Sequence, residues 1–119
     1  MRLHHVQVSC PTGEEDAARR FYGEALGLPE VEKPPVLAPR GGCWFRDDAV
    51  EVHVGVEEPF RAAGKAHPAF LVASDELKDL AVRLEAAGFG VRWDGDLPGY
   101  RRFYTADAHG NRVELLAAL

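Results

Sequence analysis

Four side chains of the types that bind metal ions are distributed over the two halves of this 119-residue sequence. They are His5, His53, His67 and Glu114. Imidazoles and a carboxylate together suit Zn, Ni, Co, Mn or Fe(II), and a set of three leaves coordination positions open for water or substrate. A single histidine on a strand is more often an ordinary surface residue. A metal site therefore requires that the fold bring these residues to one face.

Alternation of apolar and polar residues assigns a face to each candidate, because successive side chains of a strand point to opposite sides of a sheet. Residues 49–56 place valines on one side and His53 on the other. Glu51 shares the side of His53, either as a solvated neighbour or as the ligand if the strand adopts another register. Residues 112–116 place Glu114 opposite the apolar side chains of that strand.

The strands that open the two halves show the same arrangement. Residues 3–10 alternate, with His5 on the more polar side, and residues 67–73 place His67 opposite Pro68, Phe70 and Val72. We therefore expect all four candidate ligands on the sheet face that points away from the helices.

The order of elements repeats after roughly sixty residues, which indicates an internal duplication. His5 then corresponds to His67, and His53 to Glu114. Each half is expected to run strand, helix, strand, strand, strand, with a short edge strand inside the proline-rich residues 28–41 of the first half. The other predicted strands are 3–10, 43–46, 49–56, 67–73, 90–93, 101–106 and 112–116, and the predicted helices are 14–26 and 75–87.

Four strands cannot bury an apolar face by themselves, so the two halves must fold as one domain, residues 1–119. We predict an α+β fold. Two βαβββ modules, about residues 1–58 and 65–119, would form a curved eight-stranded mixed sheet with helices on the outside. Thr12 is the expected N-cap of the first helix and Ser74 that of the second, paired with Leu77, and the helices should stop at Gly27 and Gly88.

Composition excludes several classes of protein. A formal net charge of −5 argues against nucleic-acid binding, which needs a basic surface. No apolar run approaches the length of a membrane span, and the opening MRLHHVQVSC lacks the continuous apolar stretch of a signal peptide. We therefore expect a cytoplasmic protein that binds neither membranes nor nucleic acid. Cys10 and Cys43 are expected to be reduced and partly buried.

Three stretches carry a resemblance to a known family: LHHVQV, AHPAFLV and RRFYTADAHGNRVELL. They resemble the glyoxalase, bleomycin-resistance and extradiol-dioxygenase group, the vicinal oxygen chelate superfamily. The last stretch is the most specific. It is similar to the closing hairpin of that family, in which an aromatic strand leads to Asp, a Gly-Asn turn and a Glu on the final strand. The resemblance covers essentially the whole chain.

The resemblance implies a divalent metal held by His5, His67 and Glu114, often within a homodimer. The family can have a further ligand on the fourth strand, and the residue at that position here is His53, or Glu51 in another register. His53 would be either a fourth ligand or a base. The shared chemistry is chelation of a small oxygenated substrate through two vicinal oxygens, as in a lyase or dioxygenase. The chain departs from the family at Ala108-His109, where proline and an aromatic residue are common, and it lacks long pocket-forming loops.

Further side chains are candidates for contact with a substrate. Trp44, Arg102 and Tyr104 are predicted on the same face as the ligands, and an arginine there could bind a carboxylate or phosphate. The alternative is that Trp44 packs and that Arg102 is solvated or paired with an acid. Two other functions also fit the sequence: a metal-free drug-binding protein of the bleomycin-resistance type, and a partner-binding module with a vestigial site.

Overall fold

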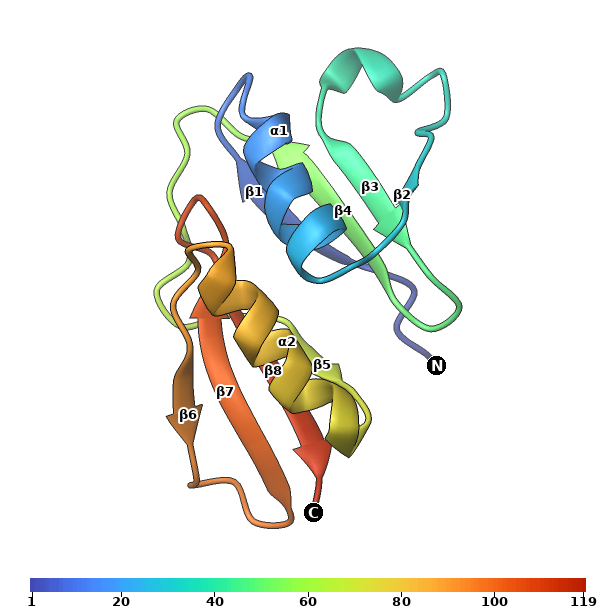
Figure 1. Cartoon of the computed structure of the whole chain (residues 1–119). Helices are drawn as coiled ribbons and strands as arrows, with labels where there is room; N and C mark the ends of the chain where they lie inside the picture. Colours follow the sequence, from blue (N-terminus) through green and yellow to red (C-terminus); the bar gives the residue numbers. More distant parts are fainter. The chain divides into compact units, whose positions relative to one another are not determined.

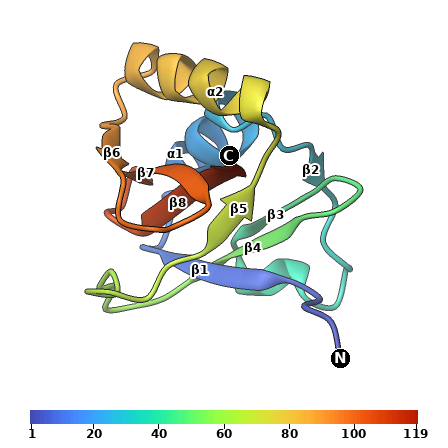
Figure 2. The same cartoon turned by 90° about the horizontal axis from the view of Figure 1, so that it is seen from below.

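The computed structural model describes residues 1–119 and divides them into two compact units, residues 1–62 and 63–119. Each unit contains one four-stranded mixed sheet with a helix across one face (Figure 1, Figure 2). The predicted α+β fold of two βαβββ modules is thereby confirmed, with the eight principal strands in two sheets of four.

Unit 1 orders its strands β1-β4-β3-β2, with β1 parallel to β4 and the other pairs antiparallel. Its elements are β1 (Val6–Cys10), α1 (Glu15–Ala18), the π-helix η1 (Arg19–Ala25), β2 (Glu30–Val31), the 3₁₀-helix η2 (Ala38–Arg40), β3 (Cys43–Arg46) and β4 (Glu51–Val56).

Unit 2 repeats this topology as β5-β8-β7-β6, again with one parallel pair at the edge. Its elements are β5 (Ala69–Leu71), α2 (Ser74–Ala86), β6 (Arg92–Asp94), β7 (Tyr100–Ala106) and β8 (Arg112–Ala118). None of the helices combines the length and the apolarity that crossing a membrane would require.

Strand register demonstrates the duplication residue by residue. In unit 1, Gln7 of β1 pairs with His53 of β4. In unit 2, Ala69 of β5 pairs with Glu114 of β8. Gln7 and Ala69 each follow a candidate histidine by two residues, so the two histidines correspond to each other, as do His53 and Glu114. The correspondence inferred from the sequence is therefore present in the backbone pairing.

Each core lies between a helix and the apolar face of its sheet. In unit 1, Phe21 and Tyr22 of η1 are fully buried, and the Tyr22 ring packs 5.9 Å from that of Phe45 on β3. In unit 2, Leu77 and Leu84 of α2 are buried, as is Phe103 of β7. Burial of such side chains supplies most of the stabilisation, at about 1.5–3 kcal/mol each.

The strands that open the two units are shorter than predicted. His5 precedes β1 and His67 precedes β5, so both lie in the segments that lead into the strands. Pro68 explains the second case, because it has no N–H to donate to the ladder, although its carbonyl still accepts from the N–H of Glu114 at 3.0 Å. In the first case, the parallel partner of β1 is β4, which starts only at Glu51. The first aligned pair is Val6 with Val52, so His5 lies before the paired residues.

The predicted N-caps of both helices are wrong. Glu14, with no capping side-chain hydrogen bond, precedes α1, and the N–H of Thr12 instead donates to Glu58 Oε1 at 2.7 Å. Ala73 occupies the N-cap of α2 and donates its N–H to Glu76 Oε2 at 3.2 Å, which leaves Ser74 in the first turn. The predicted stops are confirmed, since both helices end at glycines with positive φ.

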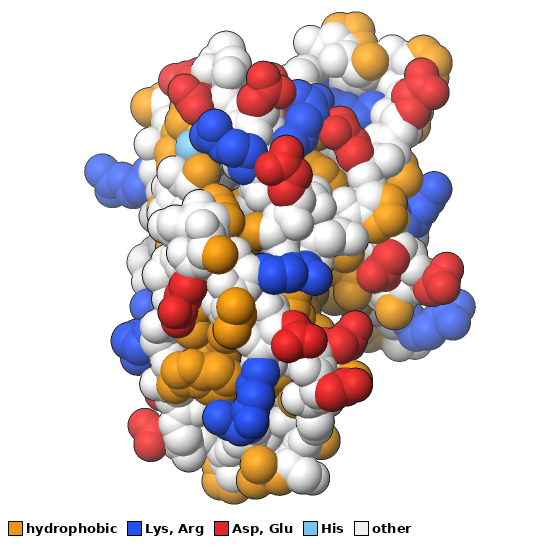
Figure 3. Space-filling view, in the orientation of Figure 1, with side chains coloured by type: hydrophobic (Ala, Val, Ile, Leu, Met, Phe, Trp, Pro, Cys, Tyr) orange, Lys and Arg blue, Asp and Glu red, His pale blue; other side chains and the backbone are white.

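In the view of Figure 3, acidic and basic side chains are interspersed. The two thiols lie inside unit 1. Cys10 and Cys43 are buried and form no disulfide, and burial raises the pKa of the Cys43 thiol to about 12.

Gly42 fixes the start of β3, and its replacement tests how closely the strands pack. Its φ is +83°, and a Cβ there would stand 2.1 Å from the carbonyl oxygen of Val54. Gly13 also has positive φ, at +80°, but an added Cβ would meet nothing within 4 Å. We expect Gly13→Ala to lower the free energy of unfolding by about 1–2 kcal/mol, and Gly42→Ala by about 3 kcal/mol or more, measured by urea denaturation. Equal losses in the two variants would contradict this packing.

Candidate functional site

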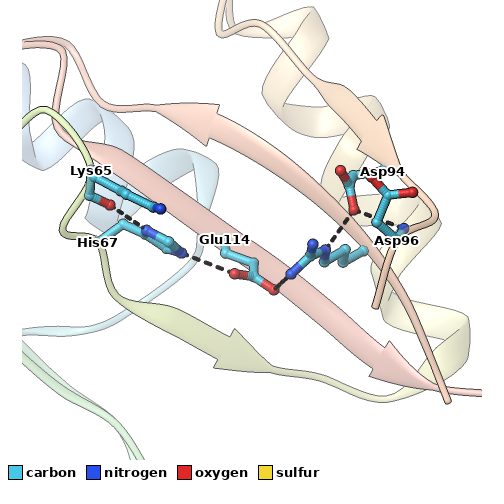
Figure 4. Close-up of polar contacts among 6 residues, drawn as sticks. Lys65, His67, Asp94, Asp96 and Glu114 are labelled. Carbon is cyan, nitrogen blue, oxygen red and sulfur yellow. Dashed lines mark hydrogen bonds and ion pairs between the residues drawn. The ribbon is translucent and has the colours of Figure 1, made fainter. Parts of the chain in front are cut away.

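The centre of unit 2 contains a direct contact between two of the predicted ligands. His67 Nε2 lies 3.0 Å from Glu114 Oε2, and the carboxylate is buried. The other ring nitrogen, Nδ1, donates to the backbone carbonyl of Lys65 at 2.8 Å. Figure 4 shows these three residues in line, with the imidazole between the carbonyl and the carboxylate. The ring is therefore fixed at both nitrogens.

The hydrogen-bond inventory of His67 leaves a place for a proton or a metal ion between Nε2 and Glu114. A carbonyl oxygen only accepts, and so does an ionised carboxylate, so both ring nitrogens face acceptors. A neutral imidazole has one N–H, and the backbone carbonyl of Lys65 accepts it. The position between Nε2 and Glu114 must therefore hold a proton or a metal ion. Ligands about 2.1 Å from an ion and at right angles around it lie about 3 Å apart, which matches the observed separation.

Two more charged side chains fix the far side of Glu114. Arg102 Nη1 donates to Glu114 Oε1 at 3.2 Å, and Arg102 Nε donates to Asp94 Oδ1 at 2.8 Å. Asp94 also accepts from the N–H of Asp96 at 3.0 Å. The hydrogen bond to Asp94 raises the pKa of Arg102, and the hydrogen bond from Arg102 lowers the pKa of Asp94. Both groups therefore remain charged, and the hydrogen bond from Arg102 orients the carboxyl group of Glu114.

Tyr104 forms the aromatic wall of this cluster in unit 2. It pairs directly with Glu114 in the β7–β8 register, and its ring meets that of His67 edge to face at 5.5 Å. The guanidinium of Arg102 lies 5.1 Å from the same ring. The three predicted residues Arg102, Tyr104 and Glu114 thus lie beside one another on one sheet face.

The corresponding cluster in unit 1 is an aromatic stack. His53 is buried, with the Trp44 ring on one face at 3.8 Å and 2°, and the His5 ring at 4.0 Å and 16°. Trp44 pairs with His53 in the β3–β4 register, as Tyr104 pairs with Glu114 in unit 2. The predicted packing role of Trp44 and its predicted place on the ligand face are therefore compatible.

Glu51 contacts the edge of the His53 ring, with Oε1 at 3.2 Å from Nε2. Burial lowers the pKa of His53, and the hydrogen bond that His53 donates to Glu51 opposes this shift only in part. The hydrogen bond with His53 lowers the pKa of Glu51. A neutral His53 that donates from Nε2 keeps its lone pair at Nδ1, which suits a metal ligand or a base.

The structure thus divides the predicted site residues into two groups. His5, His53 and Trp44 meet in unit 1, and His67, Glu114, Arg102 and Tyr104 meet in unit 2. Neither unit by itself brings three His, Cys, Asp or Glu side chains close enough to hold a metal ion. Asp94 was missed, because the predicted strand 90–93 ends one residue before it, whereas β6 includes it. Its parity with Arg92 was the signal that could have placed it on the ligand face.

The low pKa of His53 predicts a pH dependence of stability in metal-free protein. The unfolded chain takes up a proton at its ordinary value near 6.5, whereas folded His53 does so only at lower pH. The unfolded state then binds more protons in that window, so the free energy of unfolding contributed by His53 rises with pH up to about 7. We expect the stability difference between wild type and His53→Gln to grow in favour of the wild type from about pH 5 to 7 in urea unfolding. A difference that shrinks over this range would contradict the shift.

Comparison with solved structures finds similar folds. A protein from Bacillus anthracis assigned to the glyoxalase family is 42% identical, with a TM-score of 0.92 over 100% of this chain and 96% of that chain. The fosfomycin resistance protein FosX from Listeria monocytogenes is 16% identical, with a TM-score of 0.78 over 100% and 94%. A glyoxalase/dioxygenase from Nostoc punctiforme is 21% identical, with a TM-score of 0.79 over 99% and 91%.

No protein-family model matches the sequence, and no curated protein matches it either. The FosX and Nostoc structures share the fold at low identity. The Bacillus anthracis protein shares both the fold and more than two fifths of the residues along the full chain. With its duplicated βαβββ modules, this chain belongs to the glyoxalase family of the vicinal oxygen chelate superfamily.

Proposed function

We propose that the protein is a metal-dependent enzyme that binds a small oxygenated molecule to a divalent ion through two vicinal oxygens. The observation that carries the proposal is the His67–Glu114 pair. Its imidazole is held between two acceptors, and its ligand atoms are 3.0 Å apart. Such a pair has the donors, the spacing and the outer hydrogen bonds of a metal site.

We propose His5, His67 and Glu114 as the three ligands, with His53 as a fourth ligand or a base. Register favours His53 over Glu51, because His53 occupies the β4 position that corresponds to Glu114 in β8. Glu51 then acts on His53 rather than on the ion, since its carboxylate accepts from the imidazole and orients it.

The bound ion would supply Lewis-acid stabilisation of negative charge that develops on a substrate oxygen. The side chains would supply the rest. Arg102, which is hydrogen-bonded to Asp94, would orient Glu114. The buried and neutral His53 can accept a proton from the substrate at a nitrogen that Glu51 does not occupy. Trp44 and Tyr104 would enclose an apolar part of the substrate.

The metal-free drug-binding alternative is less well supported by these residues. A protein that binds drugs without metal would present an apolar cleft, whereas the ligand face of unit 2 has a buried carboxylate at its centre. Burying a carboxylate with an imidazole and a guanidinium carries a desolvation cost. A protein that binds drugs through apolar contacts would gain nothing from these groups. The identity of the ion would decide between lyase-type and oxygen-dependent chemistry.

Metal content is the direct test. For protein purified without chelator or affinity tag, we expect about one equivalent of a transition metal per chain, by elemental analysis. Glu114→Ala and His67→Ala should each lose it, because each removes a ligand. Glu85→Ala should retain it, since Glu85 lies exposed on α2. Added chelator should lower the melting temperature of the wild type and of Glu85→Ala only.

Failure to take up added Zn, Ni, Mn or Fe(II) by wild-type protein with a native circular dichroism spectrum would refute the metal-dependent function. Retention of metal by Glu114→Ala would instead refute the ligand assignment.

We also propose that the protein forms a homodimer, in which the ligands of the two modules belong either to one chain or to two. Co-expression of His5→Ala and Glu114→Ala chains with different tags distinguishes these arrangements. If each ion is bound by two chains, the isolated heterodimer has one intact ligand set and one doubly altered set, so it binds one ion. If each ion is bound by one chain, both sets are damaged and the heterodimer binds none.

A further inference from the structure

We propose that unit 2 has an anion-binding pocket beside the His67–Glu114 pair, formed by Arg92 and Arg112, which takes a carboxylate or phosphoryl group of the substrate. The assignment of this group to the substrate rests on the proposed function. The pocket itself does not, because it lies within one unit and needs no metal.

The pocket is an open cavity of about 500 Å³ on the ligand face of unit 2. Side chains of β6, β7 and β8 form one part of it, and the segment before β5 and the turn before β8 form the rest. Its lining contains no aspartate or glutamate. The residues are Ala63, Gly64, Gly90, Val91, Arg92, Tyr104, Thr105, Ala106, Gly110 and Arg112.

Two guanidinium groups in this cavity have no acidic partner. Arg92 lies 5.0 Å from the centre of the Tyr104 ring, and Arg112 lies 5.6 Å from it. Neither forms a salt bridge, whereas Arg102 beside the same ring is tied to Asp94 and Glu114. The carboxylate of Asp94 interacts with Arg92 through space, but its hydrogen bond goes to Arg102. The cavity thus contains two guanidinium groups that form no salt bridge, one of which, Arg92, also experiences the charge of Asp94.

An arginine that stacks on an aromatic ring and forms no salt bridge is suited to binding an oxyanion. The planar guanidinium presents parallel N–H donors that match a carboxylate or a phosphoryl group, and stacking on an aromatic ring restricts its movement. The glycines of the cavity add accessible backbone, since a Cβ built at Gly64 or Gly90 would meet nothing within 4 Å. A negatively charged group that enters the cavity would therefore meet donors and positive charge, and no acid.

The basic pair is not a general feature of the duplicated module. By register, Arg112 corresponds to Glu51 in unit 1, because each lies two residues before the central residue of its strand. Arg92 pairs with Tyr104, as Val31 pairs with Trp44. Unit 1 thus has a carboxylate and an apolar side chain at the corresponding positions. The two arginines are specific to unit 2. This points to a binding role in unit 2 rather than to a structural role that both modules share.

Tyr104 connects the pocket to the proposed metal ligands. One ring contacts His67 edge to face at 5.5 Å and also adjoins both pocket arginines. A substrate chelated at the His67–Glu114 pair could extend past this ring and place an anionic group in the pocket. The geometry points to small molecules with vicinal oxygens at one end and a carboxylate or phosphoryl group at the other.

The experiment is titration of chelator-treated wild-type protein with inorganic phosphate and, separately, with acetate, at constant ionic strength, by calorimetry and amide chemical shifts. We expect saturable binding with shifts at Gly64, Gly90 and Gly110. Arg92→Gln and Arg112→Gln should each weaken it about tenfold. The matched control is Arg101→Gln, because Arg101 also stacks on an aromatic ring, Trp93, at 4.8 Å, but lies outside the pocket.

The anion that binds more tightly identifies the class of group that the pocket takes. Absence of saturable binding of either anion to the wild type would overturn the proposal, and so would an equal loss in Arg101→Gln, which would indicate general attraction by surface charge. Because the protein is metal-free throughout, a negative result here leaves the metal measurement unaffected, and a protein that binds phosphate but no metal would refute only the enzyme proposal.

Discussion

The burial of one carboxylate, that of Glu114, constrains the rest of unit 2. An ionised group inside a protein is tolerated only when opposite charge and hydrogen bonds surround it. Three elements meet this requirement: the segment before β5 supplies His67, β7 supplies Arg102, and β6 supplies the Asp94 that holds Arg102. Figure 4 shows how these contacts follow one another across the sheet. The order and register of four strands are thus tied to one side chain.

The same topology supports different chemistry in the two units. In unit 1 the central residue of the sheet is an imidazole, which aromatic rings cover on both faces. In unit 2 it is a carboxylate, which charged groups surround. The backbone pairing is equivalent, so the difference arises from side chains alone. A duplicated scaffold can therefore hold an imidazole and a carboxyl group at corresponding points of its two sheets.

Much of the site could be predicted because strand alternation is a local property. The buried valines Val52 and Val54 placed His53 on the opposite face, and the alternation of β8 did the same for Glu114. What escaped prediction depends on which side chain a group meets on another segment or strand. The N–H of Thr12 is taken by Glu58, and Asp94 is paired with Arg102 across a hairpin. Periodicity can place a residue such as Asp94 on a face, but the partner that it meets there follows only from the register of the strands.

The burial of Cys10 and Cys43 has a practical consequence. A thiol reacts as its thiolate, and a pKa raised to about 12 leaves Cys43 almost wholly protonated near neutral pH. With both sulfurs enclosed in the core of unit 1, reagents in solution have little access to either one. A cysteine introduced at the surface would therefore be the principal target of a maleimide. A fluorophore or a spin label could therefore be attached at a chosen position without first replacing the two native cysteines.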